Sequence, residues 1–157
     1  MPDAIRGLTS GMGVAGALRG ICISPITAWL GDPCVYERHL AVGVSKSTTE
    51  GSPAAPCLRI AHIQFWRFRW AVEVGARTVT VQVKQAINAA PYPKIVIKAN
   101  PDVGLAADVT QSAGPGSDWK SISAGFNASA IGAVWVELHN ALPTGNYDCF
   151  FDHIVTA

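Results

Sequence analysis

The fold of this chain is decided by its last part, which reads W-K-S-I-S-A-G-F (residues 119–126), G-A-V-W-V-E-L-H-N (132–140) and C-F-F-D-H-I-V-T-A (149–157). In each run apolar and polar residues alternate, and turn-forming residues separate one run from the next. Alternation with a period of two allows a strand to bury one face and expose the other. Three such strands at the end of a chain predict a β-sandwich or a β-barrel.

Earlier residues continue the same alternation. The run W-R-F-R-W-A-V-E-V (66–74) directs its aromatic and valine side chains, Val74 included, to one side and its charged side chains to the other. Gly75-Ala76 then predicts a hairpin turn into the next alternating run, 78–85. No stretch has convincing helical spacing. Strands are expected at 21–30, 36–44, 57–64, 66–74, 78–85, 94–99, 107–112, 119–126, 132–139 and 149–157. In the strand at 57–64, Leu58, Ile60 and Ile63 are expected to face inward.

Size and charge limit the classes of function. With 157 residues, the chain is long enough for one domain with a proper core, which we place at 21–157. Charged residues make up only 15% of the chain, and the net charge is +1. A nucleic-acid partner is not expected without a basic surface, nor a membrane-spanning segment without an apolar run of about 20 residues. The low charge favours a surface that is partly covered by other subunits.

The first twenty residues (1–20) contain five glycines and fit neither helical nor strand periodicity. They predict an extended N-terminal arm that a neighbouring subunit, or the sandwich itself, holds in place, because ordering glycine costs conformational entropy. The apolar residues available for such contacts are Ile5, Leu8, Met12, Val14 and Leu18.

The four cysteines, Cys22, Cys34, Cys57 and Cys149, are widely spaced and form no C-x-x-C pair. Structural zinc sites normally use close pairs, so no zinc site is expected. Two disulfides could form in any of three pairings. However, the N-terminus has no basic stretch followed by an apolar one, so no signal peptide is expected. Synthesis in a reducing cytoplasm with buried free thiols is therefore the prediction.

From residue 57 onward, the chain resembles the galactose-binding-like jelly roll, the fold of many carbohydrate-binding modules. The resemblance is carried by the alternating pair 66–84, then W-K-S-I-S-A-G-F (119–126), G-A-V-W-V-E-L (132–138) and F-D-H-I-V (151–155). It implies an all-β jelly-roll sandwich of about 8–10 antiparallel strands following the N-terminal arm. The segment K-I-V-I-K-A-N-P-D-V-G-L-A-A-D-V (94–109) also looks like the standalone jelly-roll domains of tailed-phage virion proteins.

Members of the jelly-roll family often hold a structural calcium ion through carboxylates near the closing strand. In this sequence Asp148 and Asp152 are weak candidates, because His153 stands where a second acidic or amide residue is usual. Calcium needs six to eight oxygen ligands in one place, and the acidic residues here are scattered. No metal and no other cofactor is therefore expected.

The strongest candidate for binding is Trp135. Its neighbours in sequence face the core, so alternation directs Trp135 outward, together with Glu137 and His139. An outward tryptophan can anchor a subunit interface, stack on a sugar ring, or lie beneath a loop or arm. On an outer face, Arg67 and Arg69 fit either an interface or a solvated surface. Two aromatic residues near prolines, Tyr92 and Trp29, are further candidates for contacts.

Three functions follow from these observations. The principal hypothesis is a non-enzymatic virion protein that decorates a capsid, forms a homo-oligomer (most simply a trimer), and docks on a protein lattice through its arm and outer sheet face. The alternative is a carbohydrate-binding module. An enzyme is the least favoured, because no G-x-S-x-G or H-E-x-x-H motif is present and the acidic side chains, including Glu73 and Glu137, lie on open strand faces.

Overall fold

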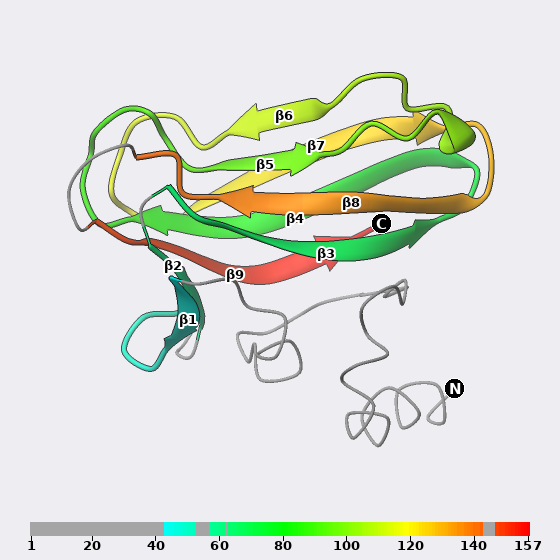
Figure 1. Cartoon of the computed structure of the whole chain (residues 1–157). Helices are drawn as coiled ribbons and strands as arrows, with labels where there is room; N and C mark the ends of the chain where they lie inside the picture. The colour runs from blue at the N-terminus through cyan, green and yellow to red at the C-terminus, as the bar shows by residue number, and fades with distance from the viewer. Residues whose placement is uncertain (1–42, 53–56, 62, 143–146) are drawn as a thin grey trace, which may run out of the picture.

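The computed structural model describes residues 43–52, 57–61, 63–142 and 147–157. These residues form two antiparallel sheets packed face to face, as Figure 1 shows. The nine strands are β1 (Val44–Ser47), β2 (Cys57–Ile60), β3 (Phe65–Val72), β4 (Gly75–Gln85), β5 (Lys94–Ile97), β6 (Val109–Ser112), β7 (Lys120–Ala128), β8 (Gly132–His139) and β9 (Cys149–Thr156). A 3-10 helix, η3 (Pro101–Val103), lies between β5 and β6.

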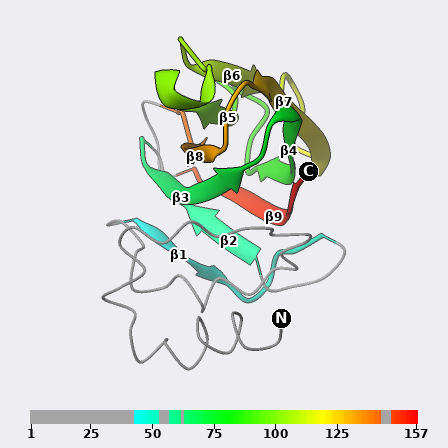
Figure 2. The same cartoon turned by 90° about the vertical axis from the view of Figure 1, so that its right-hand side faces the viewer.

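One sheet has five strands in the order β1-β2-β9-β4-β7, and the other has four in the order β3-β8-β5-β6. The view along the strands in Figure 2 shows the two layers. Some strands that neighbour each other in a sheet are far apart in the sequence, such as β3 and β8, which pair over their full lengths. The fold is the expected all-β jelly-roll sandwich. The alternating runs form strands because each buries one row of apolar side chains between the sheets.

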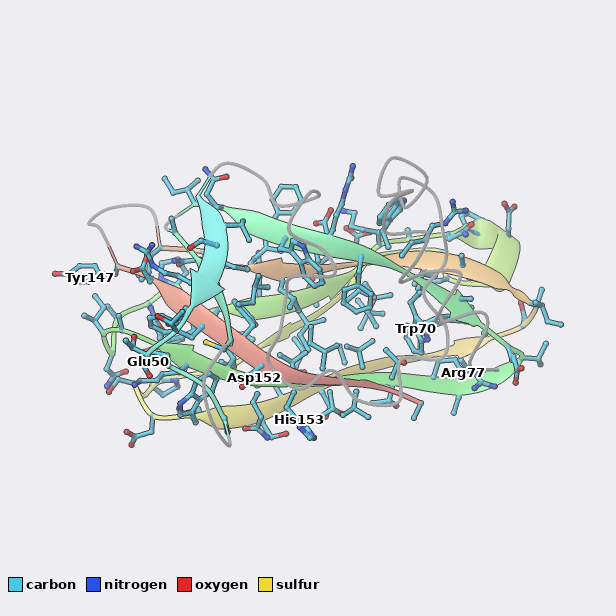
Figure 3. The ribbon with its side chains drawn as sticks, turned by 90° about the horizontal axis from the view of Figure 1, so that it is seen from below. Glu50, Trp70, Arg77, Tyr147, Asp152 and His153 are labelled. Atoms are coloured by element: carbon cyan, nitrogen blue, oxygen red, sulfur yellow. The ribbon has the colours of Figure 1, made fainter. Side chains whose placement is uncertain are left out.

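The core lies between the two sheets. Trp66, Phe68 and Trp70 of β3 are almost fully buried, and Trp70 meets the ring of Phe126 on β7 edge to face, with 6.2 Å between centroids. In Figure 3 Trp70 points into the space between the sheets. Alternating valines of β4 and alternating residues of β8 complete this core. The inward positions predicted for the aromatic residues of β3 and for the neighbours of Trp135 on β8 are confirmed.

The predicted hairpin between the runs at 66–74 and 78–85 is wrong. β3 pairs with β8, whereas β4 pairs with β7 and β9 in the opposite sheet. The chain crosses between sheets at Gly75, whose φ of +116° suits glycine. Val74 belongs to this crossing and is 57% exposed, so its predicted inward position is also wrong.

Two further differences concern the strands near the N-terminal side of the domain. The strand expected at 36–44 was to end at Val44, but Val44 begins β1 (Val44–Ser47), which pairs with β2. Ile63 was expected to face inward, but it follows the end of β2, has a φ of +60° and is 60% exposed. The N-terminal arm and the strand expected at 21–30 lie outside the described residues.

Two of the cysteines, Cys57 and Cys149, are fully buried and free, as predicted. Burial raises the pKa of each thiol to about 12. The other two cysteines lie outside the described residues. Within the described part of the chain, there is no helix long and apolar enough to cross a membrane.

Candidate binding face on the four-stranded sheet

The outward side chains of β3, β8 and β5 lie in rows that the strand register fixes. Arg69 is paired with Trp135 in one row, and Arg67 with Glu137 in the next. A third row contains Phe65, His139 and Lys94. Five of the predicted site residues therefore meet on one surface: Arg67, Arg69, Trp135, Glu137 and His139. We call this surface the outer face of the four-stranded sheet, and in Figure 1 its strands run one above the other as β6, β5, β8 and β3.

Trp135 is half-buried near the middle of this outer face, as its alternation with the buried Val134 and Val136 predicted. The guanidinium carbon of Arg67 lies 4.7 Å from the centre of the indole ring, and that of Arg69 lies 6.0 Å from it. A cation over an indole ring is held there by the ring quadrupole, with about 0.5–1 kcal/mol at an exposed site. The two arginines of β3 therefore lean across the strand boundary onto β8.

Glu137 and His139 form a second pair on β8. The Nε2 atom of His139 lies 2.8 Å from Oε2 of Glu137, and the His139 ring stacks on Phe65 with 5.0 Å between centroids. The sequence placed Glu137 on an open strand face, but only 9% of this residue is exposed. Glu137 lies on β8 between β3 and β5, in register with Arg67 and Val96. That prediction is corrected.

Sequence reasoning missed several members of this face. Phe65 is 37% exposed and points outward, as counting back by two from Arg67 indicates. On β5, Lys94 and Val96 lie beside His139 and Glu137. Lys98 follows β5, and its ammonium group binds the carboxylate of Asp108, which holds the Asp108 pKa below its usual range. The alternation of β5 could have identified its outward residues, but not their neighbours on β8.

The outer face of the five-stranded sheet is arranged differently. The segment after β1 folds back over it: the Glu50 carboxylate is 2.8 Å from the ammonium group of Lys84 on β4, and the Ser52 backbone N–H donates to Asp152 of β9. A covering segment of the chain itself thus occupies part of this second face.

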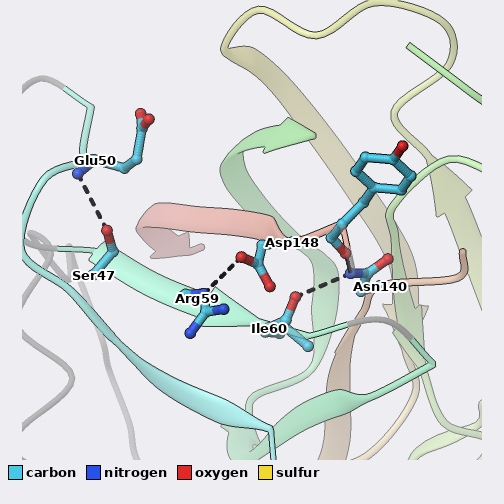
Figure 4. A network of polar contacts seen from close by, with 7 residues as sticks. Ser47, Glu50, Arg59, Ile60, Asn140 and Asp148 are labelled. Atoms are coloured by element: carbon cyan, nitrogen blue, oxygen red, sulfur yellow. Dashed lines mark hydrogen bonds and ion pairs between the residues drawn. The ribbon is translucent and has the colours of Figure 1, made fainter. Parts of the chain in front are cut away.

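The two calcium candidates are used for other contacts. Asp148 accepts a hydrogen bond from Arg59 Nε at 2.8 Å, as Figure 4 shows. Asp152 is 1% exposed, and its two oxygens accept the backbone N–H groups of Ser52 and His153. Burial raises the pKa of this carboxyl group above its usual value. Among the described residues, no three His, Cys, Asp or Glu side chains gather as they would around a metal ion.

The remaining candidates are placed only in part. Tyr92 is half-buried in the connection between β4 and β5, and whether it contacts a partner stays a prediction. Trp29 and the five apolar residues of the N-terminal arm (Ile5, Leu8, Met12, Val14 and Leu18) lie outside the described residues.

No protein-family model matches the sequence, and the curated proteins contain no match. Among solved structures, the chain is similar to a family 16 carbohydrate-binding module, with a TM-score of 0.57 and 13% identity over 73% of this chain and 85% of that one. It is also similar to the C-terminal CBM6 of a marine laminarinase from Zobellia galactanivorans, with a TM-score of 0.50 and 12% identity over 82% of this chain and 97% of that one. At these identities the likeness establishes the fold alone, a jelly-roll sandwich of two antiparallel sheets.

Proposed function

We propose that this protein is a non-catalytic carbohydrate-binding module and that it binds glycan on the outer face of the four-stranded sheet. The observation that carries the proposal is Trp135, a half-buried indole in the central part of that face, with Phe65 on the adjacent strand. Aromatic rings offer sugars a flat apolar surface, and the polar side chains around them offer hydrogen bonds. The structural neighbours support the proposal, because they are carbohydrate-binding modules with the same sandwich.

Docking on a capsid lattice, the principal hypothesis from the sequence, has no support from the comparisons. It stays a prediction, as do the virion location and the homo-oligomer. The aromatic and arginine residues of the outer face also suit a protein interface. A mass measurement in solution would test self-association independently of glycan binding.

The test of the proposed function is affinity electrophoresis of the full chain through gels that contain xylan, galactan, laminarin, polygalacturonate or carrageenan. We expect retardation by at least one polysaccharide, and a loss of about tenfold in association constant for Trp135→Ala, which is about 1.4 kcal/mol. The matched control is Phe150→Ala, which removes a half-buried aromatic side chain from β9, in register with Arg59 and Lys84 of the other sheet.

Circular dichroism of both variants shows whether each remains folded. The proposal is wrong if none of these polysaccharides retards the parent protein, or if a folded Trp135→Ala variant is retarded as strongly as the parent.

A further inference from the structure

We infer that the glycan recognised by this outer face is acidic, bearing carboxylate or sulfate groups, and that Arg67 and Lys94 bind those groups. This inference rests on the proposed function. It comes from the charges that the strand register assembles on the face and from the way in which Arg67 is held against Trp135.

The outer face carries more positive than negative charge. The described residues of the outer face include four basic side chains, Arg67, Arg69, Lys94 and Lys98. They include two acidic side chains, Glu137 and Asp108, so the basic residues outnumber the acidic ones by two. The whole chain has a net charge of only +1. Glu73 lies past the end of β3, 4.0 Å from Arg77, and does not belong to the face. Positive charge is thus concentrated on this face, although the chain as a whole is nearly neutral.

Both carboxylates of the face already have a partner. Glu137 pairs with His139, and Asp108 binds Lys98. Within the described part of the chain, no carboxylate lies within ion-pair distance of Arg67 or Lys94. Arg67 is directly opposite Glu137 in the register, yet its guanidinium group lies over Trp135 instead. These two cations are therefore available to an anionic ligand.

The position of Arg67 distinguishes an acidic glycan from a neutral one. A neutral sugar that stacks on the Trp135 ring has to displace the guanidinium group, which lies 4.7 Å from the ring centre, whereas an acidic sugar can pair with that group beside the ring. A guanidinium group held against an indole keeps its N–H donors for other partners. Those donors match carboxylate or sulfate oxygens in a bidentate geometry, and the order imposed by the ring reduces the entropy lost on binding.

Lys94 extends the charged area across the sheet. It lies on β5, two strands from Arg67 and one row along, with His139 and Glu137 between them on β8. With adjacent strands about 4.8 Å apart, the two backbones are separated by roughly 10 Å across the sheet. A polysaccharide chain that crosses β3, β8 and β5 would place successive anionic groups near Arg67 and Lys94.

The test compares polysaccharides that differ in charge and share a backbone, using the full chain in isothermal titration calorimetry or affinity electrophoresis. Polygalacturonate is compared with highly methyl-esterified pectin, in which the carboxylates are masked. Carrageenan is compared with chemically desulfated carrageenan, which keeps the backbone and lacks the sulfates. We expect binding to the charged member of at least one pair and at least tenfold weaker binding to its neutral counterpart. The pair that responds shows whether carboxylate or sulfate is the ligand group.

Variants assign the effect to the two cations. Arg67→Gln and Lys94→Gln should each weaken binding of the acidic polysaccharide about tenfold, because each removes a charge-assisted hydrogen bond. The matched control is Lys84→Gln, which removes the same charge from β4 in the other sheet and should bind like the parent. Affinity should fall as NaCl is raised from about 50 mM to about 500 mM, because salt screens exposed charges.

The outcomes separate this inference from the proposed function. Equal binding of the charged and neutral members, with no effect of Arg67→Gln, would overturn the acidic-glycan inference and leave glycan binding intact. Binding of poly-L-glutamate as tight as that of the polysaccharide would also overturn it, since the face would then attract any polyanion. If no polysaccharide binds, the proposed function fails and this inference fails with it.

Discussion

Replacing Asn140 with alanine should destabilise the sandwich by about 3 kcal/mol. Asn140 follows β8 and is 1% exposed. Its side-chain amide donates to the carbonyl oxygens of Ile60 at 3.0 Å and Tyr147 at 2.9 Å, and its carbonyl accepts the Leu142 backbone N–H at 3.2 Å. Figure 4 shows the donor side of this network. Asn140 thereby joins the end of the four-stranded sheet to β2 and to the residues just before β9 in the other sheet.

The magnitude follows from the three hydrogen bonds. Each contributes about 1 kcal/mol net, and alanine leaves three backbone groups without this partner, so the loss is about 3 kcal/mol and reaches about 5 kcal/mol if water does not enter. For a domain of this size, the melting temperature should fall by about 6–12 °C. Urea unfolding followed by tryptophan fluorescence measures the change. The comparison requires an unchanged dependence of the unfolding free energy on urea.

Asn127→Ala is the control, because Asn127 is an exposed residue of β7 and its loss should change stability by no more than about 0.5 kcal/mol. If Asn140→Ala costs as little as this control, the inference that Asn140 ties the two sheets together is refuted.

Three further predictions concern buried positions. Burial raises the pKa of Cys57 and Cys149 to about 12, so near pH 8 the thiolate fraction of each should be about 10³-fold below that of a thiol with a pKa of 9.0. Peptide mapping should therefore show that iodoacetamide alkylates these two cysteines only when urea unfolds the protein. Rapid alkylation of the native protein at either site would contradict this. A Cβ added at Gly132 would overlap Cγ1 of Val103, so Gly132→Ala should cost about 1–3 kcal/mol in urea unfolding. The same substitution should cost less in a protein that already carries Val103→Ala, because the overlapping methyl group is then absent. Burial raises the pKa of Asp152 above 3.8, so the folded state binds a proton at this carboxyl group more tightly than the unfolded state does. The unfolding free energy of the parent, compared with that of Asp152→Asn, should therefore be greatest below pH 3.8 and should fall as the pH rises through the pKa of the folded state. If the stability of the parent relative to Asp152→Asn instead increases with pH, this prediction is wrong.

Much of the candidate site was accessible from the sequence, because alternation fixes the face on which a side chain lies. Trp135 follows from its buried neighbours on β8, and Arg67 follows from the buried aromatic residues of β3. The assignment of both residues to an outer face required no knowledge of the rest of the fold.

The partners of these residues were not accessible, because alternation does not say which strands are neighbours. The run at 66–74 was expected to form a hairpin with the run at 78–85, yet β3 pairs with β8, some seventy residues later. The contacts of Arg67 with Trp135 and of Phe65 with His139 depend on that pairing. The position of Glu137 between Arg67 and Val96 depends on it as well.

The central claim is that glycan binds on the outer face of the four-stranded sheet, and its most direct test is titration of the isotopically labelled protein with a binding oligosaccharide, followed by two-dimensional NMR. The largest shift changes should occur at the Trp135 indole N–H and in the backbone of β3, β8 and β5, with little change in β4 and β9. Shift changes centred on β4 and β9, with Trp135 unaffected, would contradict the account.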